Sequence, residues 1–141
     1  MLAWAVLALS ALGLLVSAYF IAVTYRWMRP DPRWMPPVCR MDEGTCAQVV
    51  HTPQARVFVL PNSVYGFGWY GLAAAAAAAQ LATGEWLACL PLVAIGLFTV
   101  AFSSYLFFQL RARLKTHCVL CYTGHALNVL LTVLFGIACF G

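Results

Sequence analysis

The sequence predicts an all-α integral membrane protein, a four-helix bundle with a long capping loop between its first and second helices. Two observations lead to this fold class: the composition and four long runs without charge. Of the 141 residues, 64% are hydrophobic and only 9% are charged. A soluble domain of this size could not cover its surface with so few charges, so the excess apolar surface must face lipid. The length allows one domain, 1–141.

The four helices follow from the apolar runs. A membrane-spanning helix needs roughly 20 apolar residues. In lipid every backbone amide needs a partner within the protein, which favours helix over open strand. The first run also resembles a signal peptide. However, it lacks the basic residues with which a signal peptide begins, and it is longer than a signal peptide's apolar region. We therefore place helices at about 2–24, 57–82, 86–110 and 118–140, with both termini on one side.

The connections predict how these helices are arranged. Residues 83–85 and 111–117 are short connections, so the helices that they join are antiparallel neighbours. Segment 25–56 is long and holds five prolines, so it cannot form one regular helix. Its tryptophans, Trp27 and Trp34, suit the headgroup interface of a membrane. We interpret this segment as a cap over one end of the bundle.

Two cysteine pairs carry the predicted chemistry. Cys118 and Cys121 form a C-x-x-C motif where the fourth helix begins, and Cys39 and Cys46 lie in the long loop. With four helices, the first and third loops are on the same side, so the two pairs face each other. A helix N-terminus and nearby basic side chains favour the thiolate, which is the nucleophile in disulfide exchange. Cys121 follows one turn later on the same face and points toward the bundle interior, where a lipid-soluble oxidant could reach it.

The cysteines could also have a structural or metal-binding role. The C-x-x-C spacing suits a static disulfide or a zinc clip, with Cys118, Cys121, His117 and a loop cysteine as ligands. A transport-type or structural membrane protein would give these cysteines no catalytic role. We expect a redox site without metal. We also expect Cys89 and Cys139, near the opposite membrane face, to be unpaired packing residues.

The motifs also have a specific order along the chain. Cys39 and Cys46 are followed by Thr52, by Asn62-Ser63-Val64-Tyr65-Gly66 and by Cys118-Val119-Leu120-Cys121. In this order they resemble the vitamin K epoxide reductase family, and in particular its prokaryotic disulfide-forming members. The resemblance covers nearly the whole chain. It implies a four-helix bundle around a quinone, of menaquinone or ubiquinone type, in a thiol oxidoreductase that oxidises a thioredoxin-like partner.

The resemblance also implies roles for the cysteines. Cys118 and Cys121 would be the redox-active pair beside the quinone, and Cys121 would contact it. Cys118 would exchange with Cys46, and Cys39 would pass oxidising equivalents to the external thiol protein.

Polar residues complete the expected quinone site. In the family's Asn-Ser motif the Asn binds a quinone oxygen, which here implies Asn62; the alternative role for Asn62 is a helix N-cap. Thr52 and Tyr65 belong to the same motifs. His125 stands where the eukaryotic vitamin K enzymes have a tyrosine, and it could donate to a carbonyl or carry a proton. This departure favours another quinone, with vitamin K quinone or epoxide reduction as the alternative. We interpret Asn128 as a helix–helix contact.

Charge and length predict the surroundings of the protein. The positive-inside rule places both cysteine pairs in the cytoplasm, whereas the family's usual orientation places them outside. We expect the cytoplasm-facing orientation, which is chemically sensible where the cytosol keeps disulfides, as in hyperthermophiles.

Many bacterial relatives carry a fused thioredoxin-like domain, and this chain stops at Gly141, so we expect a separate partner. Lipid and the quinone pool are the other partners, and no nucleic acid is expected. The eight basic residues, all on the cysteine side, are Arg26, Arg29, Arg33, Arg40, Arg56, Arg111, Arg113 and Lys115.

Overall fold

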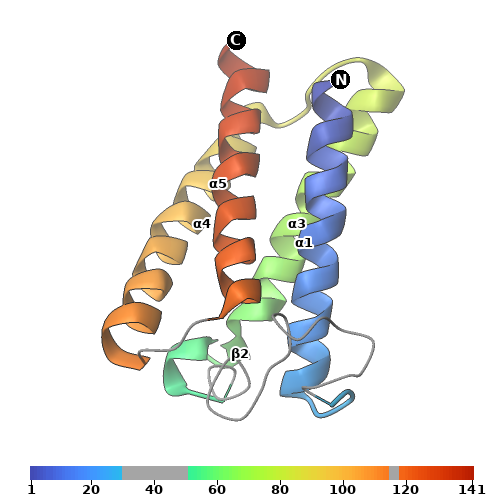
Figure 1. Cartoon of the computed structure of the whole chain (residues 1–141). Coiled ribbons are helices and arrows are strands. Elements are labelled where there is room, and N and C mark those ends of the chain that lie inside the picture. Colours follow the sequence, from blue (N-terminus) through green and yellow to red (C-terminus); the bar gives the residue numbers. More distant parts are fainter. Residues whose placement is uncertain (30–50, 115–117) are drawn as a thin grey trace.

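The computed structural model describes residues 1–29, 51–114 and 118–141. The predicted all-α membrane bundle is confirmed, and both termini lie at the same end (Figure 1). We call this end the far end, and the opposite end, where the hairpin and Cys118 lie, the loop end. In chain order the elements are α1 (Leu2–Thr24), the 3-10 turn η2 (Pro53–Ala55), β1 (Arg56–Val57), β2 (Leu60–Pro61), α3 (Asn62–Thr83), α4 (Cys89–Gln109), the π turn η3 (Leu110–Leu114) and α5 (Val119–Phe140).

Three of the four helices are long and apolar enough to cross a membrane. They are α1, α4 with the start of η3, and α5. With 22 residues, α3 is about 33 Å long, enough for a hydrocarbon core of about 30 Å. Its hydropathy is lower because glycines and alanines take the place of larger aliphatic residues. Small residues suit it to close packing against its neighbours rather than to contact with lipid.

Two helices begin later than the sequence suggested. The stretch before α3 forms a hairpin in which Arg56 pairs with Pro61 and Val57 pairs with Leu60. Phe58 makes the turn with a φ of 56°, so the chain cannot run straight into the helix. Likewise, Ala88 adopts a φ of 57° immediately before α4, which therefore begins at Cys89.

The contact between α1 and α3 depends on one glycine and one tyrosine. The Tyr70 ring of α3 lies directly against Gly13 of α1, where a Cβ would overlap the ring. The Tyr70 hydroxyl donates to the backbone oxygen of Gly124 in α5 at 3.0 Å. Tyr70 is 3% exposed, so a single side chain joins three helices at the middle of the bundle.

A regularly spaced set of residues joins α4 to α5, and we call it the α4–α5 seam. Seven residues are close to two helical turns, so residues at this spacing lie on one face of a helix. The principal contacts of α4 with another helix are those with α5, whereas α1 contacts both α3 and α5. From the far end to the loop end, the seam consists of the Cys89–Cys139 disulfide, Gly96 against Thr132, the Ser103–Asn128 hydrogen bond, and Leu110 in one buried cluster with Cys118.

Candidate functional site: a thiol beside an intramembrane cavity

The C-x-x-C motif opens α5, as the sequence predicted. Cys118 is the N-cap of this helix, with an extended backbone at φ −119° and ψ 101°. Its sulfur accepts a hydrogen bond from the backbone N–H of Cys121 at 3.3 Å. Helix N-termini leave backbone N–H groups without partners inside the helix, and here a cysteine sulfur accepts from one of them.

The two cysteines of the motif differ in bonding and in surroundings. Cys118 is fully buried at the loop end, in a cluster with Tyr19, Val23 and Leu110. It is disulfide-bonded. Cys121 is half-buried and carries a free thiol, so the two are not bonded to each other. Cys39 and Cys46 lie outside the described residues.

Cys121 lies on a cavity inside the bundle. The cavity has a volume of about 330 Å³ and is lined by all four helices and by the hairpin. Ligand pockets are usually mostly apolar with a few polar groups, and roughly 300–1,000 Å³ in size. The walls fit that description, since Phe20, Phe98, Phe102 and Leu106 contribute aromatic and aliphatic surface.

The polar residues singled out in the sequence all line this same cavity. They are Thr52, Asn62, Tyr65 and His125. Asn62 is the first residue of α3, and the N-cap is Pro61, so the interpretation of Asn62 as an N-cap is wrong.

Two of these residues have contacts that fix their place in the cavity wall. The Tyr65 hydroxyl donates to the backbone oxygen of Val57 at 3.2 Å and ties α3 to the hairpin. The edge of the Phe107 ring meets the His125 ring, with centroids 6.2 Å apart and an interplanar angle of 83°.

Sequence reasoning missed part of the cavity wall. The Asn128 side-chain amide donates to the Ser103 hydroxyl at 2.7 Å, which confirms the expected helix–helix contact. Both residues also line the cavity, and the Asn128 side-chain oxygen is buried without a partner among the described residues. The signal was present in the spacing, because Asn128 follows Cys121 by seven residues and so lies two turns deeper on the same face.

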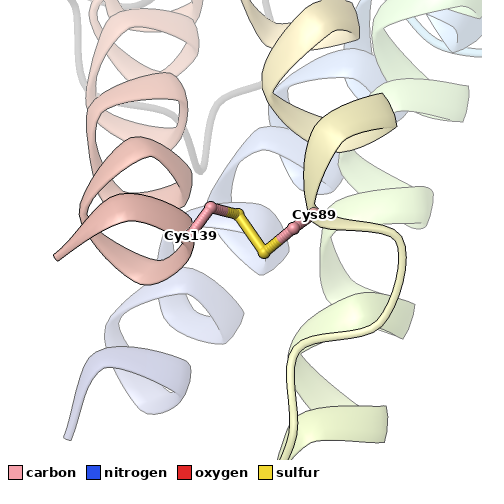
Figure 2. Close-up of a disulfide and its surroundings, with 2 residues drawn as sticks. All are labelled: Cys89 and Cys139. Atoms are coloured by element: carbon pink, nitrogen blue, oxygen red, sulfur yellow. A yellow bond between two sulfur atoms is a disulfide. The ribbon is translucent and has the colours of Figure 1, made fainter.

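The expectation of unpaired cysteines at the far end is wrong. Cys89 and Cys139 form a disulfide between the start of α4 and the end of α5 (Figure 2). Their Cα atoms are 5.6 Å apart, within the usual range for disulfides. The sequence placed both residues near the same membrane face on antiparallel neighbours, but it did not reveal that the two helix ends are in register.

The zinc-clip interpretation loses support from the bonding of Cys118. Zinc ligation requires a thiolate, and a sulfur in a disulfide cannot supply one. Within the described ranges, no group of three or more His, Cys, Asp or Glu side chains is placed to hold a metal ion, and His117 and the loop cysteine of the zinc clip lie outside these ranges.

A membrane bundle with a C-x-x-C motif at a helix N-terminus, one of its thiols facing a cavity between the helices, is the arrangement expected of a membrane thiol oxidoreductase. The family model for the vitamin K epoxide reductase family matches residues 4–135. The chain therefore belongs to this family, as its motifs predicted. Membership makes it a membrane thiol–disulfide oxidoreductase linked to quinone or epoxide reduction. No curated protein shows a significant match to the chain.

Proposed function

We propose that this protein oxidises the dithiol of a separate thioredoxin-like protein and passes the electrons to a quinone of menaquinone or ubiquinone type. One observation carries the proposal: the free thiol of Cys121 lines an intramembrane cavity, whereas its neighbour Cys118 is disulfide-bonded at the loop end. One sulfur is thus placed for exchange with other disulfides, and the other is placed to reach a lipid-soluble acceptor.

The proposed reaction balances over two disulfide exchanges. The partner's two thiols become a disulfide while the Cys39–Cys46 disulfide becomes two thiols. Cys46 then attacks Cys118 of a Cys118–Cys121 disulfide and displaces the Cys121 thiolate. Cys39 next attacks Cys46 of the resulting Cys46–Cys118 disulfide, so that the loop pair is oxidised again and Cys118 and Cys121 are left as thiols. Reoxidation of this pair to a disulfide would transfer two electrons and two protons to an acceptor in the cavity. Thiolate attack on a disulfide sulfur accounts for each exchange.

The cavity residues fit a quinone, which when bound supplies the acceptor for both electrons and both protons. The apolar walls suit a ring that enters from lipid. Asn62 lines the cavity and offers an amide donor for a carbonyl oxygen. His125 offers ring nitrogens that can donate to or accept from a bound ligand. Thr52 and Tyr65 form the loop-end wall of the same cavity.

Anaerobic turnover tests the proposed reaction. Reduced thioredoxin-like protein is mixed with purified enzyme and a short-chain quinone, and thiol loss and quinone absorbance are followed together. We expect one quinone to be reduced for each dithiol oxidised. Cys121→Ser should abolish quinone reduction, and Ser104→Ala, a change on the exposed face of α4, should not. Loss of thiols without a change in quinone absorbance would refute the proposal.

The proposed orientation places the redox cysteines toward the cytoplasm. In the sequence, all eight basic residues fall in the first and third connections and their flanks, whereas Glu85 is the charged residue of the connection between α3 and α4. Short basic loops remain on the cytoplasmic side during membrane insertion.

Reporter fusions at Gly141 distinguish the two orientations. With the loop end inside, an even number of helices places the C-terminus outside. Alkaline phosphatase fused there should be active, and green fluorescent protein should be dark. The opposite pattern would restore the family's usual orientation and would make secreted proteins the clients.

A further inference from the structure

The Cys89–Cys139 disulfide has no place in the proposed electron path. It joins α4 to α5 at the far end (Figure 2), whereas Cys118 and Cys121 lie at the start of α5. Figure 1 shows that α5 starts at the loop end. Cys118 precedes α5 and Cys139 lies near its end, so about 20 residues of helix, or roughly 30 Å, separate the two sites. Direct thiol exchange across that distance is impossible, so this disulfide serves another purpose.

Apart from this disulfide, α4 has few buried residues that attach it to the rest of the bundle. Few residues of α4 are buried, namely Leu92, Gly96 and Ser103. Lipid tails are as apolar as leucine, so no hydrophobic driving force presses a helix such as α4 against the bundle. Its attachment therefore depends on the specific contacts of the α4–α5 seam.

The same helix forms one wall of the cavity. Phe98, Thr99, Phe102, Ser103, Leu106 and Gln109 of α4 all line it. Their position relative to α5 is set by the register of the seam: Ser103 must meet Asn128, and Phe107 must meet His125. A shift of α4 by one residue, about 1.5 Å along its axis, would break the 2.7 Å hydrogen bond between Ser103 and Asn128.

We infer that the Cys89–Cys139 disulfide is a covalent register lock, which holds the α4 wall of the quinone cavity in place and thereby sets quinone affinity. Cys89 and Cys139 are thus positioning residues for the quinone site. The inference rests on the proposed function, since it assigns the cavity to a quinone. It assigns no electron transfer to the lock, which stays oxidised through the catalytic cycle.

The test compares three states of one chain. In a variant with Cys39, Cys46, Cys118 and Cys121 all changed to Ser, the lock is the remaining pair of cysteines. The lock is left oxidised, reduced with a phosphine, or reduced and then bridged through both sulfurs by dibromobimane. Binding of a water-soluble naphthoquinone and of a short-chain benzoquinone is measured by quenching of tryptophan fluorescence, because Trp69 lines the cavity.

We expect reduction to weaken quinone binding by about tenfold, the equivalent of about 1.4 kcal/mol, and bridging to restore it. Equal dissociation constants in the oxidised and reduced states would overturn the inference and leave the proposed function intact. Absence of quenching in all three states and in the parent protein would refute the quinone site itself, and the inference with it.

A second measurement uses the active enzyme with Cys89→Ser and Cys139→Ser together. The KM for quinone should rise by about tenfold, whereas kcat at saturating quinone and the KM for the thioredoxin-like partner should stay the same. A general loss of folded enzyme would lower kcat and leave both KM values unchanged, and that result would also contradict the inference.

Discussion

The two ends of the bundle hold cysteine sulfurs in different bonding states and in different surroundings. At the loop end, Cys121 is a free thiol on a cavity of about 330 Å³. At the far end, Cys89 and Cys139 are bonded to each other. The core toward the far end is filled by aromatic rings: Phe135 meets Trp69 and Trp86 edge to face, with centroids 5.9 Å and 5.7 Å apart.

This difference indicates that the surroundings of a cysteine, an open cavity or a contact between two helix ends, determine its role in this fold. Both cysteine sites belong to the same pair of antiparallel helices and lie at the two ends of one seam. A thiol that faces open space can meet a second reactant, whereas a disulfide between two helix ends can only hold them together. The comparison predicts different behaviour of the two sites under mutation.

The largest effect is expected from removal of the outer loop cysteine. Cys39→Ser leaves Cys46 without its resolving partner, so a Cys46–Cys118 disulfide should accumulate with Cys121 free. Turnover of the partner protein should fall by roughly a thousandfold or more, since the exchange path is interrupted. Mass spectrometry of nonreduced digests identifies the bonded peptides.

The far-end disulfide is the internal control for this experiment. Cys89–Cys139 should appear in the parent and in the variant in the same proportion, because it takes no part in exchange. A dominant Cys46–Cys121 bond would reverse our assignment of the two cysteines in the motif. Scrambled bonds that include Cys89 or Cys139 would contradict the separation of the two ends.

A smaller effect is expected from a polar residue of the cavity. Asn62→Ala removes an amide donor that we assign to a quinone oxygen. One lost hydrogen bond of about 1–1.5 kcal/mol corresponds to a rise of about tenfold in the KM for quinone. Initial rates at varied quinone concentration measure it. Ser104→Ala, whose hydroxyl donates to the backbone of its own helix, is the matched control. An unchanged KM for quinone would show that Asn62 does not bind the quinone.

Much of the fold was predictable because the membrane restricts the choices. Only helices satisfy their backbone within a single span, so four apolar runs meant four helices. The helix starts were less predictable. Apolar residues such as Val57 and Phe58 suit a strand or turn as well as a helix, and the hairpin became visible only in three dimensions.

The candidate site was predictable where function demands rare residue types. A C-x-x-C motif at a helix start and an Asn or His within an apolar run stand out, and Asn62, His125 and Cys121 do share one cavity. The Cys89–Cys139 bond was missed because pairing depends on the register of α4 and α5. That register is set by small residues such as Gly96, which carry no distinctive chemical signal.

The smallest effect is expected from this glycine, and it tests whether the seam is as tight as the far-end disulfide implies. A Cβ at Gly96 would lie 2.7 Å from the Thr132 hydroxyl oxygen. Thr132 cannot easily move away, because it is buried and its hydroxyl donates to the Asn128 backbone oxygen at 2.7 Å. Gly96→Ala should therefore destabilise the bundle by about 1 kcal/mol, since overpacking outweighs the better helix propensity of alanine.

The control for this change lies on the opposite helix. No atom lies within 4 Å of a Cβ built at Gly136 of α5, so Gly136→Ala should leave stability unchanged or raise it slightly. Thermal unfolding in detergent compares the two variants, and Thr132→Ala combined with Gly96→Ala should recover part of the loss. Equal melting temperatures for Gly96→Ala and Gly136→Ala would show that the seam is loose at its centre. In that case the disulfide alone would hold the far end of α4, and its reduction should then have a larger effect on quinone affinity.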